Sequence, residues 1–128
     1  MIYKKHFKIN EARDLIPMLK GKLIIMRNLA ERLKAIGYDI YQGDYRPGFH
    51  PGTHTEFPED YLKLRQLVTD IFSLGIEIKG IEQGLVDFPA IRENGEEVFL
   101  CWKMDEDDIE FWHGIDDGFY GRQHIDEF

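Results

Sequence analysis

A long apolar period in the first third of the chain constrains its fold more than any other feature. Between residues 12 and 40, apolar or small side chains recur at alternating steps of four and three: Ala12, Ile16, Leu19, Leu23, Met26, Ala30, Leu33, Gly37 and Ile40. This spacing is typical of a helix that packs through one face in the left-handed manner of a coiled coil. It predicts a helix from about residue 11 to about residue 41, with Asn10 as its N-cap. Such a helix is about 45 Å long.

A second, shorter helix is predicted to begin at Pro58, Glu59 and Asp60, which are typical of a helix start, and to end at Gly75. Its apolar side chains share one face: Leu64, Leu67, Val68, Ile71 and Phe72. A helix of about 25 Å cannot cover the whole apolar face of the first helix. A sheet or another copy of the chain must cover the rest, and we expect a homodimer that forms through the long helix.

Further along the chain the pattern changes to that of short antiparallel strands, in the segments IEIK, LVDFPAIR, EVFLCWKM and IEFW. The Asn-Gly pair at 94–95 suggests a two-residue turn between the second and third segments. That register, however, places Pro89 at a hydrogen-bonded position, where it has no N–H to donate. A bulged loop of three residues, 93–95, pairs Arg92 with Glu96 and removes the conflict, so we predict the bulged loop.

The same register sorts these two strands into two faces. One face is apolar and is expected to meet the helices: Val86, Phe88, Ala90, Val98, Leu100, Trp102 and Met104. The other face is half polar and is expected to be available: Asp87, Pro89, Ile91, Glu97, Phe99, Cys101 and Lys103. We therefore predict an α+β fold, in which a helical hairpin with one very long N-terminal helix packs on a small antiparallel sheet of about four strands. Residues 1–128 are expected to form a single domain, with the hairpin at 10–75 and the sheet and C-terminal tail at 76–128.

Charge is divided unevenly along the chain. Residues 1–64 hold 11 basic and 8 acidic side chains, a net charge of +3, whereas residues 65–128 hold 5 and 16, a net charge of −11. An acidic half repels phosphate, so we expect no nucleic-acid partner. No stretch approaches the roughly 18 apolar residues of a membrane span, and the N-terminus lacks the apolar region of a signal peptide. We therefore expect no membrane partner and a cytoplasmic location.

The segment 42–57 breaks every period with glycines, prolines and aromatic residues, and is predicted to be a long loop. His50, His54 and Glu56 suggest metal ligands because a step of four places two imidazoles on one face of a helix. Pro51 lies inside that step and is incompatible with the helix, so the geometry is lost. We predict no metal site and no cofactor.

Four segments carry a resemblance to a known family. They are FKINEARDLIPML at 7–19, GLVDFPA at 84–90, LCWKM at 100–104 and FWHGIDDGFYGRQ at 111–123. Together they resemble the signature segments of a bacterial family described only as domain of unknown function 2203, which opens with a short strand and a long helix that contains a proline. The resemblance covers nearly the whole chain and implies no activity, catalytic residue or ligand.

The candidate site lies where the chain leaves the last strand. If IEFW pairs antiparallel to LCWK, His113 leaves the sheet near one rim and the following tail folds back over the half-polar face that carries Asp87. The candidate ligand-binding residues are Asp87, Trp102, His113, Asp116 and Arg122. A histidine beside carboxylates and an arginine is suited to anion binding or to acid–base chemistry.

The alternative is structural. Arg122 would make a bidentate ion pair with Asp87, Asp116 or Asp117 and tie the tail down, while His113 would hydrogen-bond a backbone carbonyl. In either case we expect Arg122 to be occupied. The leading hypothesis is accordingly a non-enzymatic binding or interaction module that self-associates through its long helix. The alternative hypothesis is a small-ligand (anion) binding or catalytic protein that uses His113, Asp116, Arg122 and Asp87.

Overall fold

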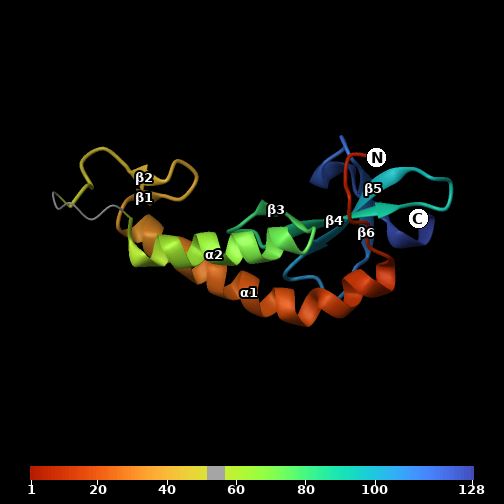
Figure 1. Ribbon diagram of the computed structural model, residues 1–128, viewed down its shortest axis with the longest axis horizontal. Helices are drawn as coiled ribbons and strands as arrows, with labels where there is room; N and C mark the ends of the chain where they lie inside the picture. Colours follow the sequence, from red (N-terminus) through yellow and green to blue (C-terminus); the bar gives the residue numbers. More distant parts are fainter. Residues whose placement is uncertain (52–56) are drawn as a thin grey trace.

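The computed structural model describes residues 1–51 and 57–128 and has an α+β fold (Figure 1). Two antiparallel helices, α1 (Ile9–Ala35) and α2 (Glu59–Ser73), form a hairpin. They lie beside an antiparallel sheet in the order β3-β4-β5-β6-β7. Its strands are β3 (Glu77–Gly80), β4 (Leu85–Ile91), β5 (Glu97–Lys103), β6 (Phe111–Gly114) and β7 (Gln123–His124). The predicted fold class is confirmed, although the sheet has five strands rather than about four, because two residues of the tail pair with β6.

Helix α1 is shorter than the periodicity predicts, and its first cap is a different residue. The helix begins after Lys8, whose N–H donates to Oε1 of Glu11 at 2.9 Å, so Asn10 is not the N-cap. It ends at Ala35 because Gly37 adopts a φ of 75° and turns the chain away. A side chain at Gly37 would collide with the ring of Phe49. The helix is therefore about 40 Å long, and the apolar spacing beyond residue 35 belongs to the turn after it.

The segment after α1 is more regular than the predicted loop. β1 (Tyr38–Asp39) and β2 (Asp44–Tyr45) form a small hairpin, in which the rings of Tyr38 and Tyr45 are 4.9 Å apart. This hairpin lies at the far end of the two helices, away from the main sheet (Figure 1). Aromatic packing, which the glycines and prolines of the sequence obscured, therefore orders the part of the loop up to residue 51.

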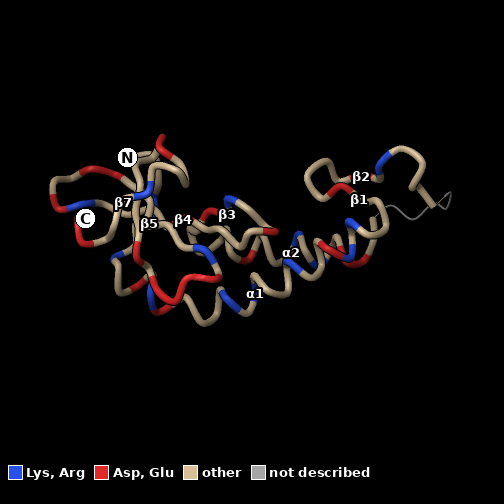
Figure 2. The backbone as a smooth tube through the Cα atoms, turned by 180° about the vertical axis from the view of Figure 1, so that it is seen from behind, with Lys and Arg blue, Asp and Glu red and all other residues tan. Residues whose placement is uncertain are grey.

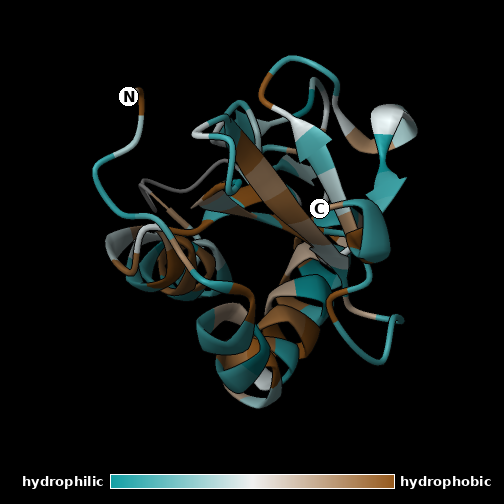
Figure 3. Ribbon diagram, turned by 90° about the vertical axis from the view of Figure 1, so that its right-hand side faces the viewer, coloured by the Kyte–Doolittle hydropathy of each residue, from teal (hydrophilic) through white to brown (hydrophobic). Residues whose placement is uncertain are grey.

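The apolar face of α1 is covered within the chain. Its central side chains are at most 2% exposed: Leu19, Leu23, Met26, Ala30 and Leu33. Helix α2 packs along the same face, and the hydrophobic strands at the centre of the sheet lie over the two helices in the end-on view (Figure 3). The sheet thus completes the cover that α2 cannot provide. A surface for self-association must therefore consist of side chains outside this buried face of α1.

The strand register confirms the bulged loop between β4 and β5. Pro89 lies opposite Phe99, and the N–H of Arg92 donates to the carbonyl of Glu96 at 2.9 Å. Gly95 has a φ of 88°, which a residue with a side chain rarely adopts. We call the face of the sheet that meets the helices the inner face and the opposite one the outer face. As predicted, the inner side chains of β4 and β5 are buried: Val86, Phe88, Ala90, Val98, Leu100 and Trp102.

Near the start of α1, opposite charges join the two halves of the chain. Nε of Arg13 lies 3.0 Å from Oδ1 of Asp108. Asp108 belongs to the turn between β5 and β6, whose run of acidic residues is red in Figure 2. Both side chains are more than 40% exposed, so the pair contributes little to stability. No helix in the described part of the chain combines the length and the apolarity that crossing a membrane requires.

Candidate functional site

The outer face of the sheet is covered, which differs from the prediction that it is available. Phe99 and Cys101 are each 1% exposed. The N-terminal segment covers part of this face, since the ring of Tyr3 packs edge-on against Phe99 at 5.2 Å. The C-terminal tail covers another part and brings Phe119 to the same face as Asp87, which confirms that the tail folds back. Periodicity alone could not reveal this cover, because both segments lack a regular pattern.

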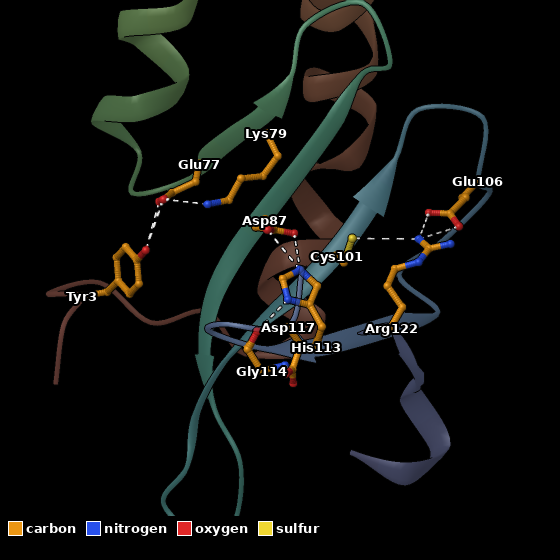
Figure 4. Close-up of polar contacts among 10 residues, drawn as sticks. All are labelled: Tyr3, Glu77, Lys79, Asp87, Cys101, Glu106, His113, Gly114, Asp117 and Arg122. Atoms are coloured by element: carbon orange, nitrogen blue, oxygen red, sulfur yellow. Dashed lines mark hydrogen bonds and ion pairs between the residues drawn. The ribbon is translucent and has the colours of Figure 1, made fainter. Parts of the chain in front are cut away.

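A buried histidine–carboxylate pair lies at the centre of the outer face (Figure 4). Nε2 of His113, on β6, is 3.1 Å from both carboxylate oxygens of Asp87, on β4. The other ring nitrogen, Nδ1, donates to the carbonyl of Gly114 at 2.8 Å, which confirms the predicted bond to a backbone carbonyl. Each of the two residues is 2% exposed. Both ring nitrogens therefore face acceptors.

The surroundings of His113 favour its protonated form. Burial lowers the pKa of the imidazole, but the hydrogen bonds to the Asp87 carboxylate and to the Gly114 carbonyl raise it by more. The pKa of His113 is therefore raised above its ordinary value. An imidazolium beside a carboxylate is a hydrogen-bonded ion pair. In this form, burying the two groups costs less free energy than burying either charge without a partner.

Arg122 is occupied, as predicted, but by a carboxylate that the sequence did not indicate. Its Nη1 lies 2.9 and 3.0 Å from the two oxygens of Glu106 and 3.9 Å from Sγ of Cys101. The guanidinium also lies between two rings, 4.0 Å from the centre of Phe111 and 4.2 Å from that of Phe119. The predicted partners Asp87, Asp116 and Asp117 were wrong, because only the folded turn between β5 and β6 brings Glu106 to the tail.

Two predicted site residues lie elsewhere. Asp116 is exposed and makes no hydrogen bond or ion pair within residues 1–51 and 57–128. Trp102 is buried on the inner face, with its Nε1 donating to the carbonyl of Glu106 at 3.0 Å. The alternation of apolar and polar residues had already assigned Trp102 to the apolar face. That alternation is a better guide to the position of Trp102 than its closeness in sequence to the other candidate residues.

Cys101 joins the site, although it was expected only as a small apolar residue in a strand. It is the register partner of Asp87 on the neighbouring strand. Burial, together with the negative charge of Asp87, raises the pKa of the Cys101 thiol to about 12, and Arg122 offsets part of that rise. A thiol that stays protonated at neutral pH is not an activated nucleophile.

A small cavity of about 220 Å³ borders this cluster. His113, Asp87 and Phe99 line it from the sheet, and Lys79 lines it from β3. Nζ of Lys79 is 3.2 Å from Oε1 of Glu77 and 4.9 Å from the ring centre of Phe99. Since both nitrogens of His113 are engaged, Lys79 is the cavity side chain best able to donate further hydrogen bonds. An anion would find few donors here.

The candidate metal ligands of the predicted loop are only partly within the described residues. His54 and Glu56 lie outside the described residues. The ring of His50 packs edge-on against the ring of Tyr45 at 5.4 Å, so it takes part in the aromatic cluster at the far end of the hairpin.

The comparisons with known proteins give one match. The model of a family described as "uncharacterized conserved protein (DUF2203)" matches residues 5–125. Searches of curated proteins and of solved structures found no match. The matched range includes both helices, all five strands of the sheet and the cluster on its outer face. The chain therefore belongs to the DUF2203 family.

Proposed function

We propose that this protein is a non-enzymatic interaction module that self-associates through its long helix. The observation that carries the proposal is a second apolar strip, formed by Met18 and Ile25 of α1 and by Ile36, the C-cap residue that follows it. Ile25 is 52% exposed and Ile36 is 48% exposed, whereas Met18 is partly buried. Steps of seven and eleven residues are about two and about three helical turns, so the three side chains share one side of the helix.

The surroundings of the strip support an interaction surface at the hairpin. Most of the exposed large apolar side chains within the described residues belong to the hairpin or its tip: Ile25, Ile36, Tyr41, Phe49, Phe57, Leu62, Phe72 and Leu74, together with Ile24, which points to another side of α1 than the strip. The two helices and β1–β2 also project beyond the sheet (Figure 1). A projecting element with exposed apolar side chains is suited to binding another protein surface.

We take the partner to be a second copy because the chain's own charges complement each other. Residues 1–64 carry a net charge of +3 and residues 65–128 a net charge of −11. Contact through α1 alone brings two basic helices together, so the antiparallel pair requires that the basic helix of each copy also meets acidic side chains of residues 65–128 of the other. Lys20, Lys22 and Lys34 of α1 make no ion pair within the described residues and are available for this role.

Small-anion binding or catalysis by Asp87, His113, Asp116 and Arg122 has less support. Arg122 and His113 are engaged by internal partners, and within the described residues Asp116 is exposed and bonds to neither of them. The ion pair of Arg122 with Glu106 then serves to fasten the tail, as the structural hypothesis expects of Arg122. We also propose a cytoplasmic location, which suits a chain whose one cysteine is buried and free of disulfides.

The test compares two adjacent substitutions by size-exclusion chromatography with light scattering. Ile25→Glu places a charge in the strip, and we expect it to convert the dimer to a monomer. Ile24→Glu is the matched control, because Ile24 is 44% exposed but points about 100° away around the helix. Equal effects of the two variants, or none, would contradict the proposed surface. Circular dichroism checks that both variants keep the wild-type helix content.

A further inference from the structure

The buried cluster on the outer face has the composition of a transition-metal site. Asp87, Cys101 and His113 come from the three adjacent strands β4, β5 and β6. One ligand atom from each, a carboxylate oxygen, Sγ and a ring nitrogen, lies within 4.8 Å of the other two. All three residues are buried. In a tetrahedral zinc site such atoms are roughly 3.3 to 3.8 Å apart, so small side-chain rotations would bring these three to binding distance.

The hydrogen bonds of His113 orient it as a metal ligand. Nδ1 donates to the carbonyl of Gly114 at 2.8 Å, and Nε2 points toward Asp87 and Cys101 (Figure 4). Metal-bound histidines usually donate their second nitrogen to a carbonyl or carboxylate, which fixes the ring and leaves the ligating nitrogen free of a proton. With Nδ1 as donor, the close approach of Nε2 to a carboxylate requires a cation between them, either a proton or a metal ion.

The residues and the cavity beside the cluster are also compatible with a bound metal ion. Arg122 donates to Sγ of Cys101 at 3.9 Å while Glu106 balances its charge, so a bound metal ion, and not Arg122, would have to supply the positive charge that a thiolate requires. The cavity of about 220 Å³, lined by Asp87 and His113, lies beside the cluster and leaves room for a fourth ligand. Sulfur and nitrogen ligands exclude Mg²⁺ and Ca²⁺, which prefer sets of oxygen atoms.

We propose that Asp87, Cys101 and His113 bind one Zn²⁺ ion, with water as the fourth ligand on the cavity side. Binding forms bonds from the metal to a carboxylate oxygen, Sγ and Nε2. The thiol proton, and the Nε2 proton where His113 carries one, pass to solvent. This site is independent of self-association through α1, since it lies on the opposite side of the sheet from the helices.

The probe is Co²⁺ added to untagged protein from which metals have been removed with a chelator. One equivalent of Co²⁺ is expected to produce a near-ultraviolet sulfur-to-cobalt absorption band, which Zn²⁺ then abolishes. Cys101→Ser is expected to lose the band, and His113→Gln to weaken binding by at least about tenfold. His50→Gln and His6→Gln, which alter histidines outside the cluster, are expected to keep both the band and the affinity.

Two results would overturn the proposal. One is a wild-type protein that gives no sulfur-to-cobalt band and takes up no Zn²⁺ by mass spectrometry. The other is a Cys101→Ser protein that is folded by circular dichroism and still binds Zn²⁺ with wild-type affinity, because the ion would then lie on surface carboxylates. Since the wild-type titration is decisive by itself, the proposal is testable even if a variant fails to fold.

Discussion

Nη1 of Arg122 lies 2.9 and 3.0 Å from the two carboxylate oxygens of Glu106, and this ion pair fastens the C-terminal tail to the turn that precedes β6. Both side chains are about 15% exposed, so the pair is better shielded from water than an ordinary surface pair. Stacking between Phe111 and Phe119 holds the guanidinium in place. This ion pair, which we call the tie, keeps the tail over the outer face of the sheet.

Removing the tie should destabilise the protein. We expect Arg122→Ala to lower the free energy of unfolding by about 2 kcal/mol, because a charged hydrogen bond and two ring contacts are lost. The midpoint of a thermal melt should fall by several degrees. Asp116→Asn is the control and should leave the melt unchanged, since Asp116 is exposed and unpaired within the described residues. An unchanged or higher midpoint for Arg122→Ala would mean that Arg122 does not tie the tail.

The buried pair of His113 and Asp87 makes stability depend on pH. The pKa of His113 is higher in the folded state than its ordinary value of 6.5, so the folded state binds the proton more tightly. The stabilisation is fully present below pH 6.5 and is lost as the pH rises through the folded-state pKa. Urea unfolding of metal-free protein at a series of pH values should show this loss in the wild type and not in His113→Gln. If the unfolding free energies of the two proteins change with pH in parallel, His113 is not the source of the lost stability.

Glu97 should make the opposite contribution at low pH. Its hydrogen bond with His6, at 2.6 Å, and those from the N–H groups of Ile2 and Tyr3 lower its pKa from 4.5 to about 2. A lowered pKa stabilises the folded state above pH 4.5, and that stabilisation is lost as the pH falls toward about 2. We expect Glu97→Gln to show a shallower acid-unfolding slope than the wild type.

The control for Glu97 is Glu110→Gln. Glu110 is exposed, and its carboxylate makes no hydrogen bond or ion pair within the described part of the chain. Its acid-unfolding slope should match that of the wild type. If Glu97→Gln also matches the wild type, the contacts of the N-terminal segment do not contribute to acid stability.

Gly37 should be the glycine of the hairpin least tolerant of a side chain. Its φ of 75° is unfavourable for alanine, and an added Cβ would collide with the ring of Phe49. We expect Gly37→Ala to destabilise the protein by more than about 1 kcal/mol in chemical unfolding. Gly21→Ala is the matched control, because nothing lies within 4 Å of its added Cβ within α1. That change should stabilise the protein by about 0.5–1 kcal/mol, and the reverse order of the two effects would contradict the assigned helix end.

Features that depend on neighbouring residues were predictable from the sequence, whereas those that depend on distant segments were not. The bulged loop followed from Pro89, because a proline that cannot donate allows only one of two registers. The inner face of the sheet followed from alternation along two strands. The partner of Arg122 did not follow, because no local pattern shows that the turn holding Glu106 meets the tail.

The boundaries of α1 show the same limit. The spacing of apolar residues continues past Ala35, but the turn at Gly37 depends on packing against Phe49, which is twelve residues further along. At the other end, the side chain of Glu11 reaches back to Lys8, so the N-cap lies two residues before Asn10. The grouping of Cys101 with Asp87 and His113 likewise required the pairing of three strands.

Sedimentation equilibrium of the untagged wild-type protein, from low micromolar to near-millimolar concentration, tests the proposed self-association most directly. The chain has a mass of 15.1 kDa. Association through the strip of Met18, Ile25 and Ile36 predicts a mass that rises with concentration to twice that value and remains there. A mass of one chain at every concentration would contradict self-association through the long helix.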